Sequence, residues 1–269
     1  MITLGVDPSL TGFGWCVHNS SVTGSARVIA RGVVNTPAAE IFVSRYIFLR
    51  TQLIHLIAEY PEIQAVGVES PPFGEDFSEG LYALFVYVNE ALYLLRKDVV
   101  YFDPLTVKLL AKMDPKVIQG TMDKNSMIVA ARAETGIHSW NNNAADAYLI
   151  GRSAARFWRL ESGEITLENL TPAEAHSFSR VHTFTRGAKA GQTKRDGLVF
   201  REGERFFKFS HLPPSPIESE YIQWLLRSSQ KSLEKDPLQP DLAPSPLQLQ
   251  RPRLKPPPKP KQPPKPPPS

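Results

Sequence analysis

The chain has 269 residues, which is long enough to bury one substantial hydrophobic core. No apolar run approaches the roughly 20 residues of a membrane span, and the N-terminus lacks the basic flank and apolar stretch of a signal peptide. The one cysteine, Cys16, excludes an internal disulfide and a cysteine-based zinc cluster. We therefore expect a soluble protein of the reducing cytoplasm.

The net charge of +4 hides an uneven distribution along the chain. Residues 1–179 carry a net charge of −5, whereas residues 180–208 and residues 231–269 each carry +5. An acidic body with basic extensions suits a protein that concentrates carboxylates in a site and binds a polyanion elsewhere. Basic extensions also occur simply to keep proteins in solution, so the charge alone does not decide between these roles.

The first stretch with a chemical signal is a pair of apolar runs near the N-terminus. Residues 2–6 are apolar and end on Asp7, and a second apolar run follows Pro8, Gly12 and Gly14. This pattern predicts two short strands joined by a turn. Asp7 then lies where a buried strand meets its turn, a place where a carboxylate needs a partner or a metal. The position equally suits an acid that accepts hydrogen bonds from the turn amides.

A second strand that ends on an acidic residue follows later in the chain. Residues 26–34 predict a third strand, and residues 39–59 have the apolar spacing of a helix. Residues 63–69 form a short apolar strand that finishes on Glu69, because the prolines that follow prevent its continuation. Glu69 therefore repeats the position of Asp7.

A second long helical pattern, residues 76–96, has aromatic and apolar residues on more than one face. Such a helix is covered on two sides, either inside the core or by a second subunit. A buried strand at 99–102 follows, and the next helical patterns are at 104–112, 123–135 and 143–158. A strand meander followed by alternating strands and helices predicts an α/β fold with a mixed sheet flanked by helices.

A third acid opens the last of these helices. Asn143 and Asp146 are three residues apart and so share one helical face. Small residues lie beside them: Ala144, Ala145 and Ala147. They let the helix start approach the sheet, which would carry Asp146 to the acidic strand ends. An acid at a helix N-terminus is also favourable by itself, because of the helix dipole.

Together these motifs resemble the RuvC family of Holliday-junction resolvases in the RNase H-like superfamily, phage-type members included. The matching motifs are Gly5-Val6-Asp7-Pro8 with Thr11-Gly12-Phe13-Gly14, then Val68-Glu69, then Asn143-Ala144-Ala145-Asp146-Ala147. Val107-Lys108 and Asp123-Lys124 are weaker matches to the family's basic positions. The resemblance covers residues 1–158 and implies a mixed five-stranded sheet.

The resemblance implies an endodeoxyribonuclease that cuts four-way junctions by two-metal phosphodiester hydrolysis in DNA recombination and repair. The implied ligands are Asp7, Glu69, Asp146 and Asn143, and such oxygen ligands suit Mg²⁺ or Mn²⁺. The family usually has Asp or His at the position of Asn143. Of three alternatives, we favour the one in which Asn143 is a neutral ligand. In the second, His138 completes the site, and in the third, the site binds metal more weakly.

Symmetric cutting of two strands implies a homodimer, with the helix at 76–96 as the interface if it is not simply a core helix. Phe73 is a candidate for stacking on a junction base, or it covers the core. Candidate phosphate contacts are Lys108, Lys112, Lys116 and Lys124, each of which also fits a solvated surface.

Beyond residue 180 the composition becomes basic and aromatic. Residues 181–185 and 198–209 predict strands around a Gly/Lys-rich loop, with Lys194 and Arg195 as candidate DNA contacts. The alternative is a structural role, in which a basic β-hairpin packs its aromatic residues on the main domain. Residues 217–230 have a helical pattern.

Residues 237–269 contain 14 prolines in 33 positions and predict a disordered basic tail. We treat it as a tether, and weak DNA binding or a proline-recognising partner are alternatives. The expected parts are a nuclease domain at 1–160, the hairpin and helix extension at 161–230, and the tail at 231–269.

Two other functions are open. An actin-like, ATP-handling protein also begins with a strand, an acid and a Gly/Thr turn, but it normally needs two such domains and Gly-rich adenine-site motifs, which the sequence lacks. An RNase H-like domain that binds branched DNA without cutting it is the second, and Asn143 is the feature that favours it.

Overall fold

The computed structural model describes residues 1–36, 41–71, 78–112, 124–183, 185–198, 200, 202–213, 223, 224 and 227. All of them belong to the first of two compact units, residues 1–232. Phe73, Lys116, most of the helix expected at 217–230 and the Pro-rich tail lie outside the described residues. Within the described part of the chain, no helix is both long and apolar enough to cross a membrane.

Six strands form one mixed sheet in the order β3-β2-β1-β4-β5-β8. The strands are β1 (Ile2–Asp7), β2 (Phe13–Asn19), β3 (Val28–Val34), β4 (Ala65–Glu69), β5 (Asp98–Phe102) and β8 (Phe206–Phe207). The first three form an antiparallel meander, and β4 and β5 run parallel to β1. The expected five-stranded mixed sheet is present, and β8 adds a sixth strand, antiparallel to β5.

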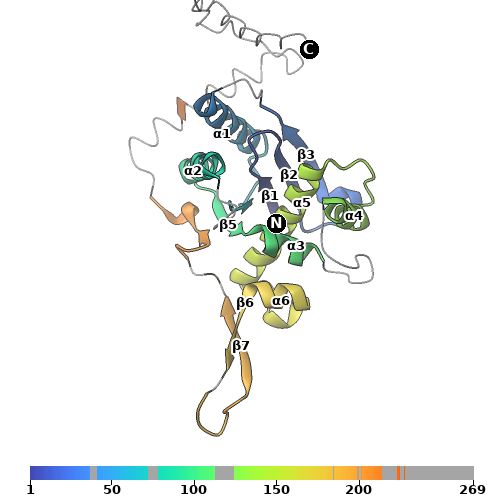
Figure 1. Ribbon diagram of the computed structural model, residues 1–269, viewed down its shortest axis with the longest axis vertical. Coiled ribbons are helices and arrows are strands. Elements are labelled where there is room, and N and C mark those ends of the chain that lie inside the picture. The colour runs from blue at the N-terminus through green and yellow to red at the C-terminus, as the bar shows by residue number, and fades with distance from the viewer. Residues whose placement is uncertain are drawn as a thin grey trace, which may run out of the picture. The chain divides into compact units, whose positions relative to one another are not determined.

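Helices cover both faces of the sheet (Figure 1). On one face lie α1 (Phe42–Glu59) and α2 (Glu79–Leu94). On the other face α5 (Asn142–Glu161) crosses the sheet, and beside it lie α3 (Pro104–Ala111), α4 (Lys124–Thr135) and α6 (Pro172–Phe178). Two buried hydrophobic clusters fill the spaces between these layers, one on each face. The result is the α/β architecture that the alternation of strands and helices predicts.

The helix α5 lies directly on the sheet because glycines face it. A Cβ atom added at Gly5 would be 1.8 Å from the carbonyl oxygen of Ala147, and one at Gly67 would be 2.7 Å from the Ala154 Cβ. At Gly14 it would be 2.2 Å from the carbonyl oxygen of Asn143. Small residues on both surfaces therefore bring the first turn of α5 next to β1 and β2, as the alanines suggested.

The C-terminal strands differ from the predicted ones. The hairpin consists of β6 (Ser179–Thr183) and β7 (Thr193–Leu198), which projects from the rest of the unit in Figure 1, and residues 198–209 do not form its second strand. The reason lies in the core: the Phe206 ring packs 5.3 Å from that of Phe157 and 5.7 Å from that of Trp158. This aromatic segment therefore joins the main sheet as β8 instead of extending the hairpin.

The helix α6 was not predicted, although its start carries a local signal. Thr171 and Glu174 form a capping box, in which each side chain accepts a hydrogen bond from the other's backbone N–H, and Pro172 occupies the first turn. This helix leads straight into β6 and so connects the body formed by the six-stranded sheet to the hairpin.

Candidate active site

Three parallel strands end on or beside an acid at one edge of the sheet. Asp7 is the last residue of β1, Glu69 is the last residue of β4, and Asp103 follows β5. The register pairs Val6 with Val68 and Glu69 with Phe102, so the strand ends are level. In α/β sheets, ligands bind in the crevice outside the carboxyl ends of the strands.

The first turn of α5 is fixed beside this edge by two asparagines. The side chain of Asn141 caps the helix by accepting a hydrogen bond of 2.9 Å from the Asn143 backbone N–H. The Asn143 side-chain N–H₂ donates to the carbonyl oxygen of Gly12, in the turn between β1 and β2. Asp146 follows one turn later on the same helical face.

These elements surround a cavity of about 290 Å³. Five residues that the sequence singles out line it: Asp7, Glu69, Asn143, Asp146 and Lys108. The other lining residues, Ser9, Pro104, Val107 and Met127, were not predicted as site residues, although Val107 belongs to one of the weaker family matches. Residues from five separate segments therefore converge on one hollow at the carboxyl edge of the sheet.

The acids in this cavity influence one another. Burial of the Glu69 carboxylate raises its pKa to about 7, and the negative charges of Asp146 and Asp103 act in the same direction. The Lys108 ammonium group lowers the pKa of Glu69 and so partly offsets them. A cavity in which carboxylates repel one another favours the binding of a cation.

Asp103 is an acid near the site that the sequence analysis did not select, although it stands at a strand end like Asp7 and Glu69. Its carboxylate accepts hydrogen bonds from the Thr106 backbone N–H at 2.8 Å, the Thr106 hydroxyl at 2.7 Å and Arg205 Nη1 at 3.0 Å. Partial burial acts to raise the pKa of Asp103, but these hydrogen bonds hold it below its usual range. Asp103 is therefore engaged in capping α3 and in binding the C-terminal extension.

The other predicted site residues lie elsewhere. His138 is exposed and is not among the residues that line the cavity. Lys112 is the C-cap of α3, Lys124 is the first residue of α4, and Lys194 and Arg195 belong to β7. The structure thus brings the three acids, Asn143 and Lys108 together, and it does not bring His138 to them.

The donors in the cavity have the chemistry of a site for a hard divalent cation. Carboxylate and amide oxygens are the ligands that Mg²⁺, Mn²⁺ and Ca²⁺ prefer, and a cation would offset the burial and the carboxylate repulsion that raise the pKa of Glu69. Within the described ranges, no group of three or more His, Cys, Asp or Glu side chains forms a ready-made metal cage. The acids line the cavity without being drawn together into a cluster.

No protein-family model and no curated protein sequence matches the chain. Among solved structures, RuvC of T. thermophilus in complex with a Holliday junction substrate is similar over 60% of this chain and 97% of that chain, with 21% identity and a TM-score of 0.50. A second Thermus thermophilus RuvC structure has 20% identity over the same shares and a TM-score of 0.49. A ROK hexokinase from Thermus thermophilus covers 42% of this chain and 38% of its own, with 17% identity and a TM-score of 0.30. From the first of these similarities, we conclude that the chain has the RNase H-like α/β fold of RuvC.

Proposed function

We propose that this chain is a metal-dependent endodeoxyribonuclease that resolves four-way DNA junctions. One observation carries the proposal: Asp7, Glu69 and Asp146 line a single cavity at the carboxyl edge of a RuvC-like sheet, with Asn143 and Lys108 beside them. The similar T. thermophilus RuvC was solved with a Holliday junction substrate, which suggests the same kind of DNA here.

The cavity residues have different roles in the proposed phosphodiester hydrolysis. Asp7 would bind both cations, Glu69 one of them, and Asp146 with the Asn143 amide oxygen the other. When bound, such a pair activates a water and neutralises charge on the attacking and leaving oxygens. Lys108 places an ammonium group in the same cavity, where it would donate a charge-assisted hydrogen bond to the scissile phosphate.

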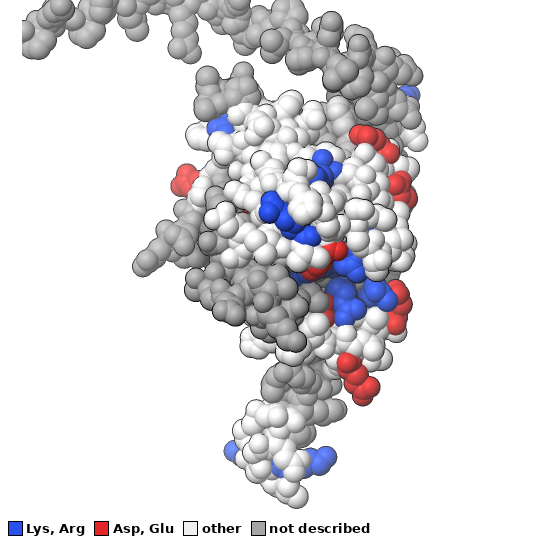
Figure 2. Space-filling view, turned by 90° about the vertical axis from the view of Figure 1, so that its right-hand side faces the viewer, with Lys and Arg blue, Asp and Glu red and all other residues white. Residues whose placement is uncertain are grey.

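The remaining DNA contacts are assigned to basic residues around the site and on the hairpin. Lys112 and Lys124 follow Lys108 on α3 and α4, and Lys194 and Arg195 lie on β7. Figure 2 shows Lys and Arg side chains at the end of the projecting hairpin, where Arg186 is exposed. Contacts of this type bind the phosphate backbone without regard to sequence.

A homodimer would supply two cavities for two symmetric cuts. Its support is a set of large apolar side chains exposed on the packed pair α1 and α2: Ile41, Phe42, Val43, Ile47, Phe48, Tyr82 and Val86. Exposed apolar patches of this kind mark interaction surfaces. The interface expected on α2 alone therefore extends over α1.

The test uses a labelled four-way junction, a linear duplex and a single strand, each with Mg²⁺, Mn²⁺ or a chelator. We expect paired symmetric nicks on the junction only, and no nicks with the chelator. The Asp7→Asn chain should lose at least about 1,000-fold in cleavage rate, because one central ligand charge is removed, and should still bind the junction. Cleavage that survives Asp7→Asn would overturn the assignment.

Two variants serve as matched controls. Asp98→Asn changes an acid at the start of β5, at the opposite end of the strand from Asp103, where Asp98 accepts a hydrogen bond from the Ser210 backbone N–H. His138→Ala tests the alternative ligand. Both variants should cut the junction at the native rate, whereas junction binding without any cutting by the native chain would indicate a non-cleaving relative.

A further inference from the structure

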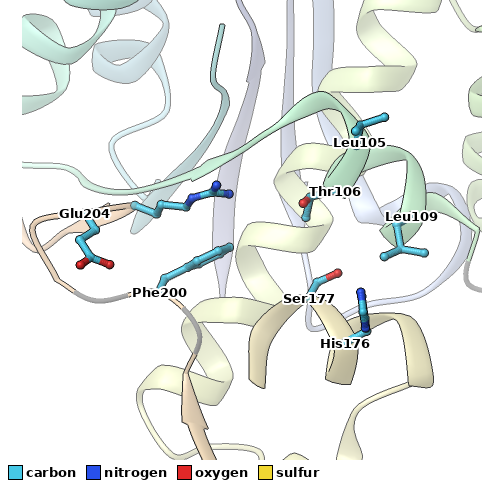
Figure 3. Close-up of a pocket in the computed structure, with 8 residues that line it drawn as sticks. Leu105, Thr106, Leu109, His176, Ser177, Phe200 and Glu204 are labelled. Carbon is cyan, nitrogen blue, oxygen red and sulfur yellow. The ribbon is translucent and has the colours of Figure 1, made fainter. Parts of the chain in front are cut away.

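A second cavity, of about 390 Å³, shares the helix α3 with the candidate active site (Figure 3). Pro104, Val107 and Lys108 face the active-site cavity, whereas Leu105, Thr106 and Leu109 line the second one. The two hollows therefore lie on different sides of one helix. The second cavity is within the size range of small-ligand sites.

Polar groups from three segments line this second cavity, and Thr106 of α3 is one of them. His176 and Ser177 come from α6, and Arg205 comes from the turn before β8. Among the described residues, the buried Ser177 hydroxyl has no hydrogen-bond partner. A buried hydroxyl without a partner is unfavourable, so this group is suited to donate to a ligand.

Apolar side chains form the rim of the same cavity. Leu105 is 77% exposed and Leu109 is 38% exposed, which is unusual for leucines on a helix that packs in the core. In Figure 3, Leu109 and Thr106 lie near His176 and Ser177, whereas the one carboxylate, Glu204, lies at the opposite end beyond Phe200. The end with His176 and Ser177 is therefore suited to an anion with an apolar part beside it.

The cavity also lies on the connection between the active site and the hairpin. The helix α6 contacts α3 and continues directly into β6, so the order in space is active site, α3, second cavity, α6 and hairpin. Figure 1 shows α3, α6 and the hairpin following one another in this order. A DNA strand running from the active site toward the basic hairpin would therefore cross the second cavity.

We infer that the second cavity binds one backbone nucleotide of the DNA arm that leaves the active site. The Ser177 hydroxyl and the His176 ring donate to its phosphate, and the deoxyribose packs on Leu105 and Leu109, while Arg205 stays paired with Asp103. This inference rests on the proposed function and adds a phosphate subsite to it. The contact is with the backbone and is independent of sequence.

The helix α3 separates the two cavities. Its width therefore sets the distance along the DNA between the scissile phosphate and the nucleotide in the second cavity. An α-helix with its side chains is about 10 Å across, and phosphates of one strand of a duplex are spaced by about 3.4 Å along its axis. Because this axial spacing is the smallest separation per step, the nucleotide in the second cavity is within about three positions of the scissile phosphate.

The test is a phosphate scan of junction binding with the full chain, with Ca²⁺ replacing Mg²⁺ so that affinity is measured apart from cleavage. Each phosphate from one to six positions on either side of the cut is replaced in turn by a neutral methylphosphonate. We expect one replacement, within about three positions of the cut, to weaken binding by the native chain about tenfold, as for loss of hydrogen bonds to a charged group. The H176A/S177A chain should show no further loss at that position.

A matched control is the S210A/H211A chain, which removes an exposed Ser and His from the 3₁₀ helix η3 (Phe209–His211), outside the cavity. It should reproduce the native scan. If the replacement weakens the H176A/S177A chain as much as the native chain, the subsite is absent even when junction cutting is normal. If the native chain neither binds nor cuts the junction, the proposed function fails as well.

Discussion

At the scale of single residues, His18 is a buried histidine whose surroundings keep it neutral. The Thr3 hydroxyl donates to the carbonyl oxygen of Gly151 at 2.9 Å, so the contact of 3.3 Å between Thr3 Oγ1 and His18 Nδ1 has the histidine as donor. Burial lowers the pKa of His18 to about 3, and the positive charges of Arg27, Arg152 and the N-terminal amino group act in the same direction. The ring contributes to packing at α5 as an uncharged group.

This environment predicts a pH-dependent stability. The unfolded chain protonates His18 below a pH of about 6.5, whereas the folded chain does so only near pH 3. The contribution of neutral His18 to the free energy of unfolding is therefore complete above pH 6.5 and is lost as the pH falls. Between pH 7.5 and pH 5, His18 should lower the free energy of unfolding by about 2 kcal/mol.

Urea unfolding of the native and His18→Gln chains at the two pH values checks this prediction. For each chain, the free energy of unfolding at pH 5 is subtracted from that at pH 7.5, and these differences are compared. The absolute stabilities are not compared, because Gln also changes the packing. The decrease should be about 2 kcal/mol smaller in the His18→Gln chain. Equal decreases in both chains would show that His18 is not the titrating group.

At the scale of elements, the contact between α5 and the sheet decides where the acids lie. Gly5 on β1 and Gly151 on α5 face each other, and a Cβ atom at Gly5 would also be 2.5 Å from the Gly151 N. The backbone of the helix, not a flexible side chain, occupies this space. The position of Asp146 relative to Asp7 therefore depends on a glycine that carries no chemistry.

The Gly5→Ala chain should be destabilised by about 3 kcal/mol and should lose junction cleavage, because the first turn of α5 must move off the sheet. Denaturant unfolding and the nicking assay measure the two effects. Gly80→Ala is the control: its Cβ atom would meet only the ends of side chains, the Leu10 Cδ1 at 3.2 Å and the Tyr46 hydroxyl at 3.4 Å, and alanine is the better helix former in α2. A Gly5→Ala chain with native stability would contradict the close packing of the helix on β1.

At the scale of the whole molecule, the described unit presents two different outer surfaces. The helices α1 and α2 expose apolar side chains, whereas the hairpin on the other side of the connection through α6 exposes basic ones. A protein that pairs with a second copy through one surface and binds DNA through another needs this separation. The net charge of −5 on residues 1–179 belongs to the body that holds the candidate active site.

We expect the native chain to sediment as a dimer and the Val86→Glu chain as a monomer, because a buried unpaired charge in the interface is strongly unfavourable. Val86 is 51% exposed in the single chain, so the substitution should leave the fold unchanged by circular dichroism. Val129→Glu on α4, where the valine is 42% exposed, is the matched control and should remain a dimer. A native chain that sediments as a monomer at micromolar concentration would exclude the dimer.

The sequence by itself determined the order of β1 to β5 and α1 to α5, and it selected Asp7, Glu69 and Asp146. These features are local: apolar runs that end on an acid, and small residues beside an acid in a first helical turn, are written within one segment. Only the tertiary structure decided that β8 joins the main sheet, and that Arg205 binds Asp103, a residue 102 positions away. Such contacts depend on which buried surfaces meet, and no periodicity within either segment encodes them.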